Sequence, residues 1–196
     1  MRVFIIVIVL IFSLQSWTKA DDISDFEIEG ISIGDSALNF FSEEKIKYNS
    51  YDYYNDKEYT PVQIEQDELY ETYDSVDFDF KTGDLTYKIH ALYGVKYYKG
   101  NINDCYEKMD QLISQMSDVF KNSAKISKKD ITKNPKLTGD LTGKTKVTRV
   151  NFWIKNNDRA SVSCYDYSEE AGNNDSLIIG LQTEEQNIFL VERAYK

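Results

Sequence analysis

Two overlapping serine patterns near the N-terminus could carry hydrolytic chemistry. The sequence GISIG (residues 30–34) has the Gly-x-Ser-x-Gly spacing of a strand-to-helix turn that exposes a nucleophilic serine. The sequence GDS (residues 34–36), with Leu38 close behind it, matches a second serine-hydrolase block. Both patterns lie between a predicted short strand and a predicted helix, as such turns should. The candidate nucleophiles are therefore Ser32 and Ser36.

A serine nucleophile also needs a base to take its proton and a group to orient that base. The chain has one histidine, His90, and it lies in the middle of the chain, on the expected polar face of a strand. In hydrolases with either pattern, the histidine comes late in the chain. A structural explanation is simpler: the glycines permit a tight turn, and Asp35 caps a helix that starts at about Ser36. We therefore predict no catalytic residue and keep a serine hydrolase using Ser32 or Ser36 as the alternative.

Neither a metal site nor a cofactor is predicted. The single histidine has no second histidine or free cysteine at a spacing typical of zinc ligands. The aspartates at 74, 77, 79 and 84 lack the spacing and the closing glutamate of a calcium loop. Asp77 and Asp79 are explained by strand alternation alone.

The first 20 residues predict export. A basic start at Arg2 precedes an apolar run over residues 3–14, and Thr18 and Ala20 form a small-residue cleavage site. A membrane-spanning helix needs about 20 apolar residues, so this run favours a cleaved signal peptide. We expect a mature chain that begins at Asp21, forms one acidic domain over residues 21–196, has no stable membrane span, and is periplasmic or secreted.

Charge is unevenly distributed along the chain. Loss of Arg2 and Lys19 with the signal peptide would change the net charge from −10 to −12, which argues against nucleic acid as a partner. Residues 21–80 contain 18 acidic residues and three lysines, whereas residues 121–149 contain nine basic and two acidic residues. The basic segment is either a solvated surface or a contact for an acidic partner. Its candidate contact residues are Lys125, Lys128, Lys129, Lys133 and Lys136.

The best-defined strand pattern spans residues 76–97. Apolar residues alternate with polar ones on both sides of the turn KTGD (residues 81–84). A two-residue loop at Thr82 and Gly83 would place every apolar residue on one face and put Asp77 opposite Lys88. The pairs expected from this register are Phe80 with Leu85, Phe78 with Tyr87, and Val76 with Ile89.

The main helix is expected over about residues 101–121, where apolar residues recur with helical spacing and include Cys105. A long loop follows over residues 122–146. In a second hairpin, apolar residues alternate from Val150 to Ile154, a three-residue loop follows at Asn156-Asn157-Asp158, and the return strand alternates up to Cys164. Its expected pairs are Ile154 with Ala160, Phe152 with Val162, and Val150 with Cys164.

The two cysteines are predicted to form a disulfide. Cys105 lies on the apolar stripe of the main helix, and Cys164 lies on the apolar face of the second hairpin. Both side chains should point into the same helix–sheet interface, and an exported protein meets an oxidising compartment. We expect the two Cα atoms to lie within about 7 Å of each other.

The C-terminal region should contain a strand over residues 177–181 and a helix over 184–194, with a strand as the alternative to that helix. Thr183 and Gln186 form a capping box, and Ile188, Val191 and Tyr195 share a helical face. Sequential hairpins and separated helices predict an α+β fold: a mainly antiparallel sheet packed against one long helix, with short N- and C-terminal helices.

A run of tyrosines could form a sugar- or peptide-binding surface. The tyrosines lie at positions 48, 51, 53, 54 and 59, in a polar segment. Tyrosines also fill the rims of small sheets, and we favour that structural explanation.

Three segments resemble a group of uncharacterised exported bacterial proteins. They are DFEIEGISIGDSALNFFSEEKIK (residues 25–47), SCYDYSEE (163–170) and TEEQNIFLVERAYK (183–196). The turn GISIGDS (residues 30–36) also resembles the opening of small envelope modules of the outer-membrane-assembly lipoprotein and β-lactamase-inhibitor-like type. The resemblance implies export and carries no functional residue. We expect a non-catalytic binding or envelope-accessory protein, with an envelope or extracellular protein as a candidate partner.

Overall fold

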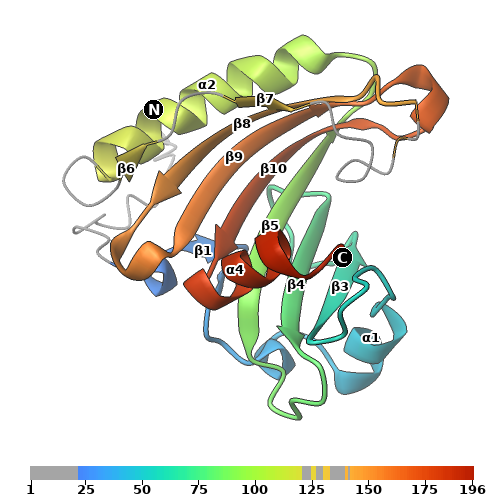
Figure 1. The fold of residues 1–196 in the computed structure, drawn as a ribbon, viewed down its shortest axis with the longest axis vertical. Helices are drawn as coiled ribbons and strands as arrows, with labels where there is room; N and C mark the ends of the chain where they lie inside the picture. The colour runs from blue at the N-terminus through green and yellow to red at the C-terminus, as the bar shows by residue number, and fades with distance from the viewer. Residues whose placement is uncertain (1–21, 121–124, 127–129, 133–139, 141) are drawn as a thin grey trace, which may run out of the picture.

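The computed structural model describes residues 22–120, 125–126, 130–132, 140 and 142–196. The predicted signal peptide therefore lies outside the described residues. The described chain is organised around one curved antiparallel sheet of eight strands (Figure 1). The spatial order starts with β3 (Tyr59–Glu65), β4 (Ser75–Lys81), β5 (Ile89–Tyr98), β10 (Asp175–Gln182), β9 (Arg159–Asp166) and β8 (Lys146–Trp153). At that edge β8 also pairs with β6 (Lys125–Ile126) and β7 (Asp130–Thr132).

The long helix α2 (Ile102–Val119) covers one face of this sheet, mainly over β9 and β10 (Figure 1). Its apolar stripe buries Cys105, Met109 and Met116. Asn101 is the N-cap residue, as expected, but its side chain makes no capping hydrogen bond. The sheet residues that form the core with this helix include Phe78, Leu92, Phe152, Val162 and Leu181. The α+β fold expected from the sequence is confirmed.

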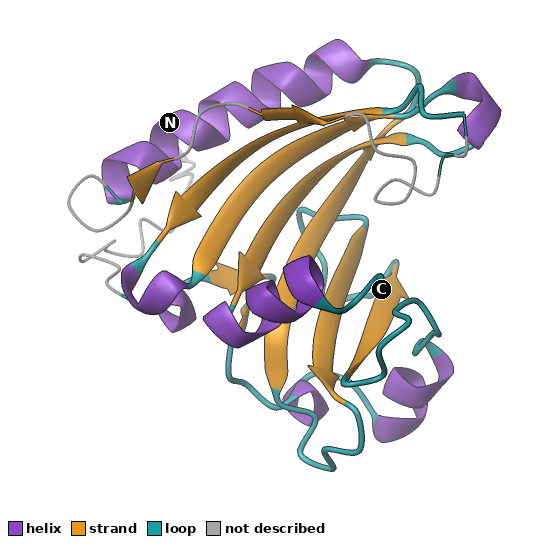
Figure 2. Cartoon of the chain, viewed as in Figure 1, coloured by secondary structure: helices purple, strands orange, loops and turns teal. Residues whose placement is uncertain are grey.

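The N-terminal elements pack on the same face of the sheet as α2, where Ile28 and Ile46 join its core, and the C-terminal helix lies on the second face. A small hairpin joins β1 (Glu27–Ile28) to β2 (Ile31–Ser32), and α1 (Glu43–Tyr48) packs near β3. Helix α4 (Glu184–Glu192) lies on the opposite side of the sheet from α2 and passes in front of the strands in Figure 2. Single turns of 3-10 helix occur at Ile23–Asp25, Ala37–Asn39, Lys155–Asn157 and Glu169–Ala171.

The N-terminal helix starts later than predicted. Ser36 caps only the 3-10 turn Ala37–Asn39, and the α-helix begins after Ser42, whose side chain accepts a hydrogen bond from the Lys45 amide. Asp35 does not cap a helix. Its carboxylate instead accepts from the backbone of Ser32 and closes the turn after β2.

The predicted register of the first hairpin is wrong, and the error reverses a strand face. Asp84 accepts hydrogen bonds from the Thr86 and Lys88 amides, which opens the connection into a longer loop and leaves Leu85 79% exposed. A bulge follows between Asp79 and Phe80. The observed pairs are Phe80 with Ile89, Asp79 with Ala91, Phe78 with Leu92, and Asp77 with Tyr93.

As a result, β5 presents the opposite set of side chains to the helix. Leu92 shares the α2 face with Phe78, whereas Ala91, Tyr93, Val95 and Tyr97 share the other face with Asp77 and Asp79. Because the side-chain period of a strand is two, a single unpaired residue is enough to exchange the two faces.

The second hairpin is displaced by two residues from its predicted register. Phe152 pairs with Ala160, Val150 with Val162, and Thr148 with Cys164. The connection is longer than expected because Ile154 bonds to Asp158 across a turn whose Asn156 and Asn157 have positive φ. A shift of two residues preserves the faces, so Cys164 still points toward α2.

The predicted disulfide is present. Cys105 on α2 and Cys164 on β9 are bonded, with Cα atoms 6.1 Å apart. Both residues are fully buried in the core between the helix and the sheet. The bond ties α2 to the middle of the sheet across a sequence separation of 59 residues.

Two further predictions need correction. Within the expected loop at 122–146, β6 and β7 add short edge strands to β8. The C-terminal helix is confirmed, but its predicted apolar face is wrong: Ile188 and Val191 are exposed, and Gln186, Asn187 and Phe189 are buried. Thr183 caps this helix through the Gln186 amide, whereas the Gln186 side chain does not complete the capping box and reaches the sheet instead.

Candidate binding cleft

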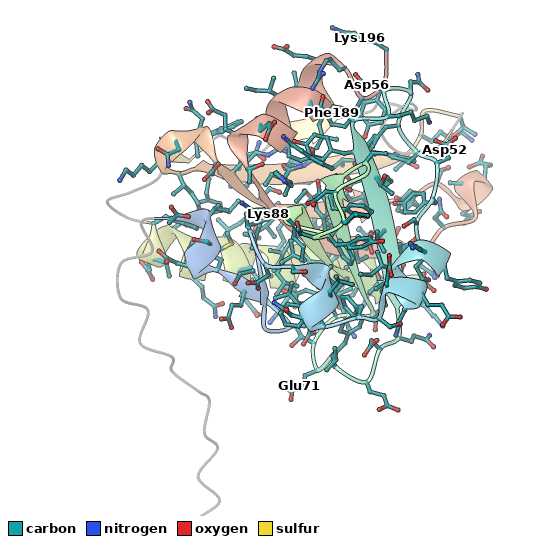
Figure 3. The ribbon with its side chains drawn as sticks, turned by 90° about the horizontal axis from the view of Figure 1, so that it is seen from below. Asp52, Asp56, Glu71, Lys88, Phe189 and Lys196 are labelled. Atoms are coloured by element: carbon teal, nitrogen blue, oxygen red, sulfur yellow. A yellow bond between two sulfur atoms is a disulfide. The ribbon has the colours of Figure 1, made fainter. Side chains whose placement is uncertain are left out.

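The sheet face opposite α2 is hollowed into a cleft with a volume of about 1290 Å³. Its floor consists of side chains from β3, β4, β5, β10, β9 and β8, and residues 51–54 and the end of α4 form part of its wall. Figure 3 shows Phe189 of α4 at the same end of the molecule as Asp52 and Asp56, which precede β3 in the chain. The cleft is larger than a typical small-molecule pocket of about 300–1,000 Å³.

The floor is organised as rows of side chains that run across the strands. In one row Asp79 pairs with Ala91, Ala91 with Gln182, and Gln182 with Arg159. In the next row the order is Asp77, Tyr93, Gly180 and Ser161. Each row therefore begins with a carboxyl group on β4 and ends on the β9 side of the sheet.

Gly180 allows the Tyr93 and Ser161 side chains of the second row to approach each other closely. A Cβ atom at this position would lie 2.9 Å from the Ser161 hydroxyl oxygen and 3.0 Å from the Tyr93 ring. Without that atom, the Tyr93 ring can lean over β10, where its hydroxyl accepts a hydrogen bond from the Gln182 amide at 2.5 Å. The carbonyl oxygen of the same Gln182 side chain accepts a hydrogen bond from Arg159.

The β4 side of the floor is acidic. Asp79 is 2% exposed, and it accepts hydrogen bonds from the Tyr54 hydroxyl at 2.9 Å and from the Gln186 amide. Burial raises the pKa of Asp79 to about 7, although both hydrogen bonds act in the opposite direction. Burial likewise raises the pKa of Asp77 to about 7, with added repulsion from Asp79 and Glu65. Two neighbouring carboxyl groups on the cleft face of β4 therefore both have a raised pKa.

The opposite side of the floor is basic. The Nε and Nη2 groups of Arg149 donate to Ser163 and Tyr165, each at 2.8 Å. Arg159 donates to Gln182 and lies over the Trp153 ring at 5.8 Å. Burial lowers the pKa of Arg159 to about 10, and repulsion from Arg149 acts in the same direction. The two guanidinium groups therefore lie on the same side of the cleft floor.

Tyrosines surround this polar floor. Tyr51 and Tyr53 are 43% and 45% exposed at the wall, and the Tyr53 ring meets the Tyr195 ring edge-on at 5.9 Å. On the far side Tyr165 and Tyr167 stack with their centroids 5.7 Å apart. Of the tyrosine run noted in the sequence, positions 51, 53 and 54 line the cleft. Tyr48 is exposed elsewhere, and Tyr59 is buried against Phe189.

The two candidate nucleophiles do not lie among the lining residues of this cleft. The Ser36 hydroxyl donates to the Thr86 carbonyl at 2.6 Å and accepts from the Leu38 amide, so it serves the turn. His90 packs edge-on to Tyr59, and its Nδ1 lies 3.9 Å from Glu185. Among the described residues no hydrogen bond joins His90 to Ser32 or Ser36. The geometry therefore gives no support to the hydrolase alternative.

The candidate partner-binding lysines are placed only in part. Lys125 lies in β6, where its backbone pairs with Trp153. Lys128, Lys129, Lys133 and Lys136 lie outside the described residues. The contact of this segment with an acidic partner stays a prediction.

Over the described ranges, no group of three or more histidine, cysteine, aspartate or glutamate side chains is placed to hold a metal ion. Within the same ranges, no helix has the length and apolar composition needed to cross a bilayer. Comparisons with protein-family models, with curated proteins and with solved structures found no match. The interpretation of the cleft therefore depends on its own chemistry.

Most of the cleft was missed from the sequence. Strand alternation placed Asp77 and Asp79 on the polar face of a hairpin, and no pattern singled out Arg149, Arg159 or Gln182. One signal was available in the sequence. The chain has four arginines beside 19 lysines, and two of the four, Arg149 and Arg159, lie next to the alternating strands of the second hairpin. Arginine is the better residue for bidentate anion contacts, so its position in a strand is informative.

Proposed function

We propose that this is an exported, non-catalytic binding protein that holds an oligosaccharide in the cleft. The observation that carries the proposal is the composition of the floor, where carboxyl, amide, guanidinium and hydroxyl side chains lie in rows between tyrosine rings. Such groups donate to and accept from sugar hydroxyls, and tyrosine offers a flat apolar surface with a polar tip.

A peptide is the less suitable occupant. Extended peptides are often recognised by strand addition, which needs a free sheet edge. The cleft lies on the face of the sheet, and the backbone groups of its central strands β5, β10 and β9 already pair with neighbours on both sides. Recognition there must use side chains, which suits a ligand with many hydroxyl groups.

Export is supported by the disulfide. A buried bond between Cys105 and Cys164 is typical of proteins that fold in an oxidising compartment. The basic start, the apolar run and the Thr18-Lys19-Ala20 site at the N-terminus point the same way. Sequencing of the exported protein should therefore start at Asp21.

The test is a glycan array followed by calorimetry on the purified protein with its disulfide formed. We expect at least one oligosaccharide to bind, and Tyr53→Ala to weaken it about ten-fold by removing a ring from the cleft wall. Tyr48→Ala is the matched control, because Tyr48 is 87% exposed and lies outside the cleft. Absence of any glycan that binds with a Kd below about 1 mM, or equal affinity of Tyr53→Ala and the wild type, would refute the proposal.

A further inference from the structure

The two arginines of the cleft floor differ from Arg193 and from Lys96, which form ion pairs. Arg193 lies 3.7 Å from Asp56 and also contacts Glu58, and Lys96, which lines the same cleft, pairs with Asp74 at 2.8 Å. Among the described residues, neither Arg149 nor Arg159 has a carboxylate oxygen within 4 Å of its guanidinium. Both side chains are partly buried. A partly buried cation without a counter-ion is costly in free energy.

The surroundings hold these charges in place without neutralising them. Ser163 and Tyr165 accept from Arg149, and Gln182 accepts from Arg159, so all of the partners are neutral. The Nε atom of Arg159 is buried and has no hydrogen-bond acceptor. The two like charges also repel each other, which contributes to the lowered pKa of Arg159.

The position of the pair suits one ligand group. Arg159, Ser161 and Ser163 alternate along the cleft face of β9, and Arg149 on β8 lies opposite Ser163. Ser161 is therefore between the two arginines and offers a hydroxyl donor. Two guanidinium groups with a hydroxyl donor between them can bind a carboxylate, sulfate or phosphate group. The protein is acidic overall, with a net charge of −10, so such a cationic spot does not follow from its composition.

We infer that the cleft ligand carries an anionic group, a carboxylate, sulfate or phosphate, that binds between Arg149 and Arg159. This inference rests on the proposed function and narrows the ligand to an acidic oligosaccharide. The anionic group lies over β8 and β9, and the uncharged part of the ligand extends across β10 and β5 toward the carboxyl groups of β4.

The first experiment tests the anion site without any sugar. The described residues include three arginines, at 149, 159 and 193, whose Nε–Hε groups give separate NMR signals that single substitutions can assign. Sodium sulfate, phosphate or acetate is titrated against sodium chloride at constant ionic strength. We expect saturable shifts for Arg149 and Arg159 and none for Arg193. Equal, non-saturating drifts of all three signals would overturn the inference.

The second experiment joins the anion to a sugar. Trigalacturonic acid, its trimethyl ester and a sulfated trisaccharide are compared by calorimetry. We expect one of the acids to bind at least ten-fold more tightly than the neutral ester, and Arg149→Gln with Arg159→Gln to abolish the preference. The Arg149→Lys, Arg159→Lys variant keeps the charge but loses the forked donors, and its preference should be intermediate. Arg193→Gln is the control for loss of an arginine elsewhere.

The outcomes separate the inference from the proposed function. Neutral sugars that bind through Tyr53 with no preference for acids and no saturable arginine shift would refute the inference and leave the oligosaccharide proposal standing. Saturable arginine shifts with no binding of any oligosaccharide would support the anion site and refute the proposed function.

Discussion

Asp79 and Arg159 lie in the same cross-strand row of the sheet but do not pair with each other. Ala91 and Gln182 stand between them, so their Cα atoms are separated by three strand spacings, roughly 14 Å. Gln182 bonds to both Arg159 and Tyr93, whereas Asp79 bonds to Tyr54 and Gln186. The sheet thus keeps an acidic and a basic group at a fixed separation within one cleft.

The stability of the protein should fall as the pH rises from about 4 to about 7. Burial raises the pKa of Asp77 and of Asp79 to about 7 in the folded state, so these groups keep protons that the unfolded chain has already released. Asp79→Asn removes one of the two ionisations. We expect the stability of this variant to depend less on pH. At pH 8 its free energy of unfolding should exceed that of the wild type by a few kcal/mol.

Urea denaturation at several pH values measures this effect. Asp52→Asn serves as the control, because Asp52 is exposed and pairs with Lys57. Its stability profile should follow that of the wild type. A wild-type stability that rises between pH 4 and pH 7, or an Asp79→Asn variant with an unchanged slope, would show that Asp79 is not a raised-pKa group.

Removal of the disulfide should lower the free energy of unfolding by about 4 kcal/mol. The bond closes a loop with a sequence separation of 59 residues and so restricts the unfolded chain. The double variant Cys105→Ala, Cys164→Ala measured by urea denaturation tests this value. Mass spectrometry of the unreduced protein should also show a crosslinked peptide pair, and free thiols on both residues would contradict the structure.

Gly180→Ala should destabilise the protein by about 1–3 kcal/mol and weaken ligand binding. The added methyl group would meet Ser161 and the Tyr93 ring and would push that ring away from Gln182. Adding Ser161→Gly to the same variant removes one of the two contacts, so it should recover part of the decrease in melting temperature. A Gly180→Ala variant with wild-type stability would mean that Tyr93 does not lie close over β10.

Neither Ser32 nor Ser36 should react with a fluorophosphonate probe. The Ser36 hydroxyl is engaged with the Thr86 carbonyl and the Leu38 amide, and within the described residues no hydrogen bond joins His90 to either serine. Ser36→Ala should instead lower stability by about 1 kcal/mol, as loss of a capping side chain does. Labelling of either serine that disappears on mutation to alanine would restore the hydrolase alternative.

Local sequence patterns were sufficient for the elements whose signal is contained within a few residues. The helical spacing around Cys105 predicts α2, and the alternation that ends at Cys164 predicts β9, so both cysteines could be assigned to the core face. The disulfide prediction was correct although the predicted register of the second hairpin was wrong by two residues. A shift of two residues leaves each side chain on the same face of the strand.

The cleft could not be derived in this way. The Asp84 loop and the bulge after Asp79 exchanged the faces of β5, and alternation alone does not reveal an extra residue in a connection. Asp79 looks like a solvated residue until Gln186, 107 positions later, folds over it. The rows from β4 to β9 likewise depend on β10 inserting between β5 and β9, a pairing set by the packing of the whole sheet. Binding chemistry that is assembled from several strands depends on their order and register, and these are properties of the tertiary structure.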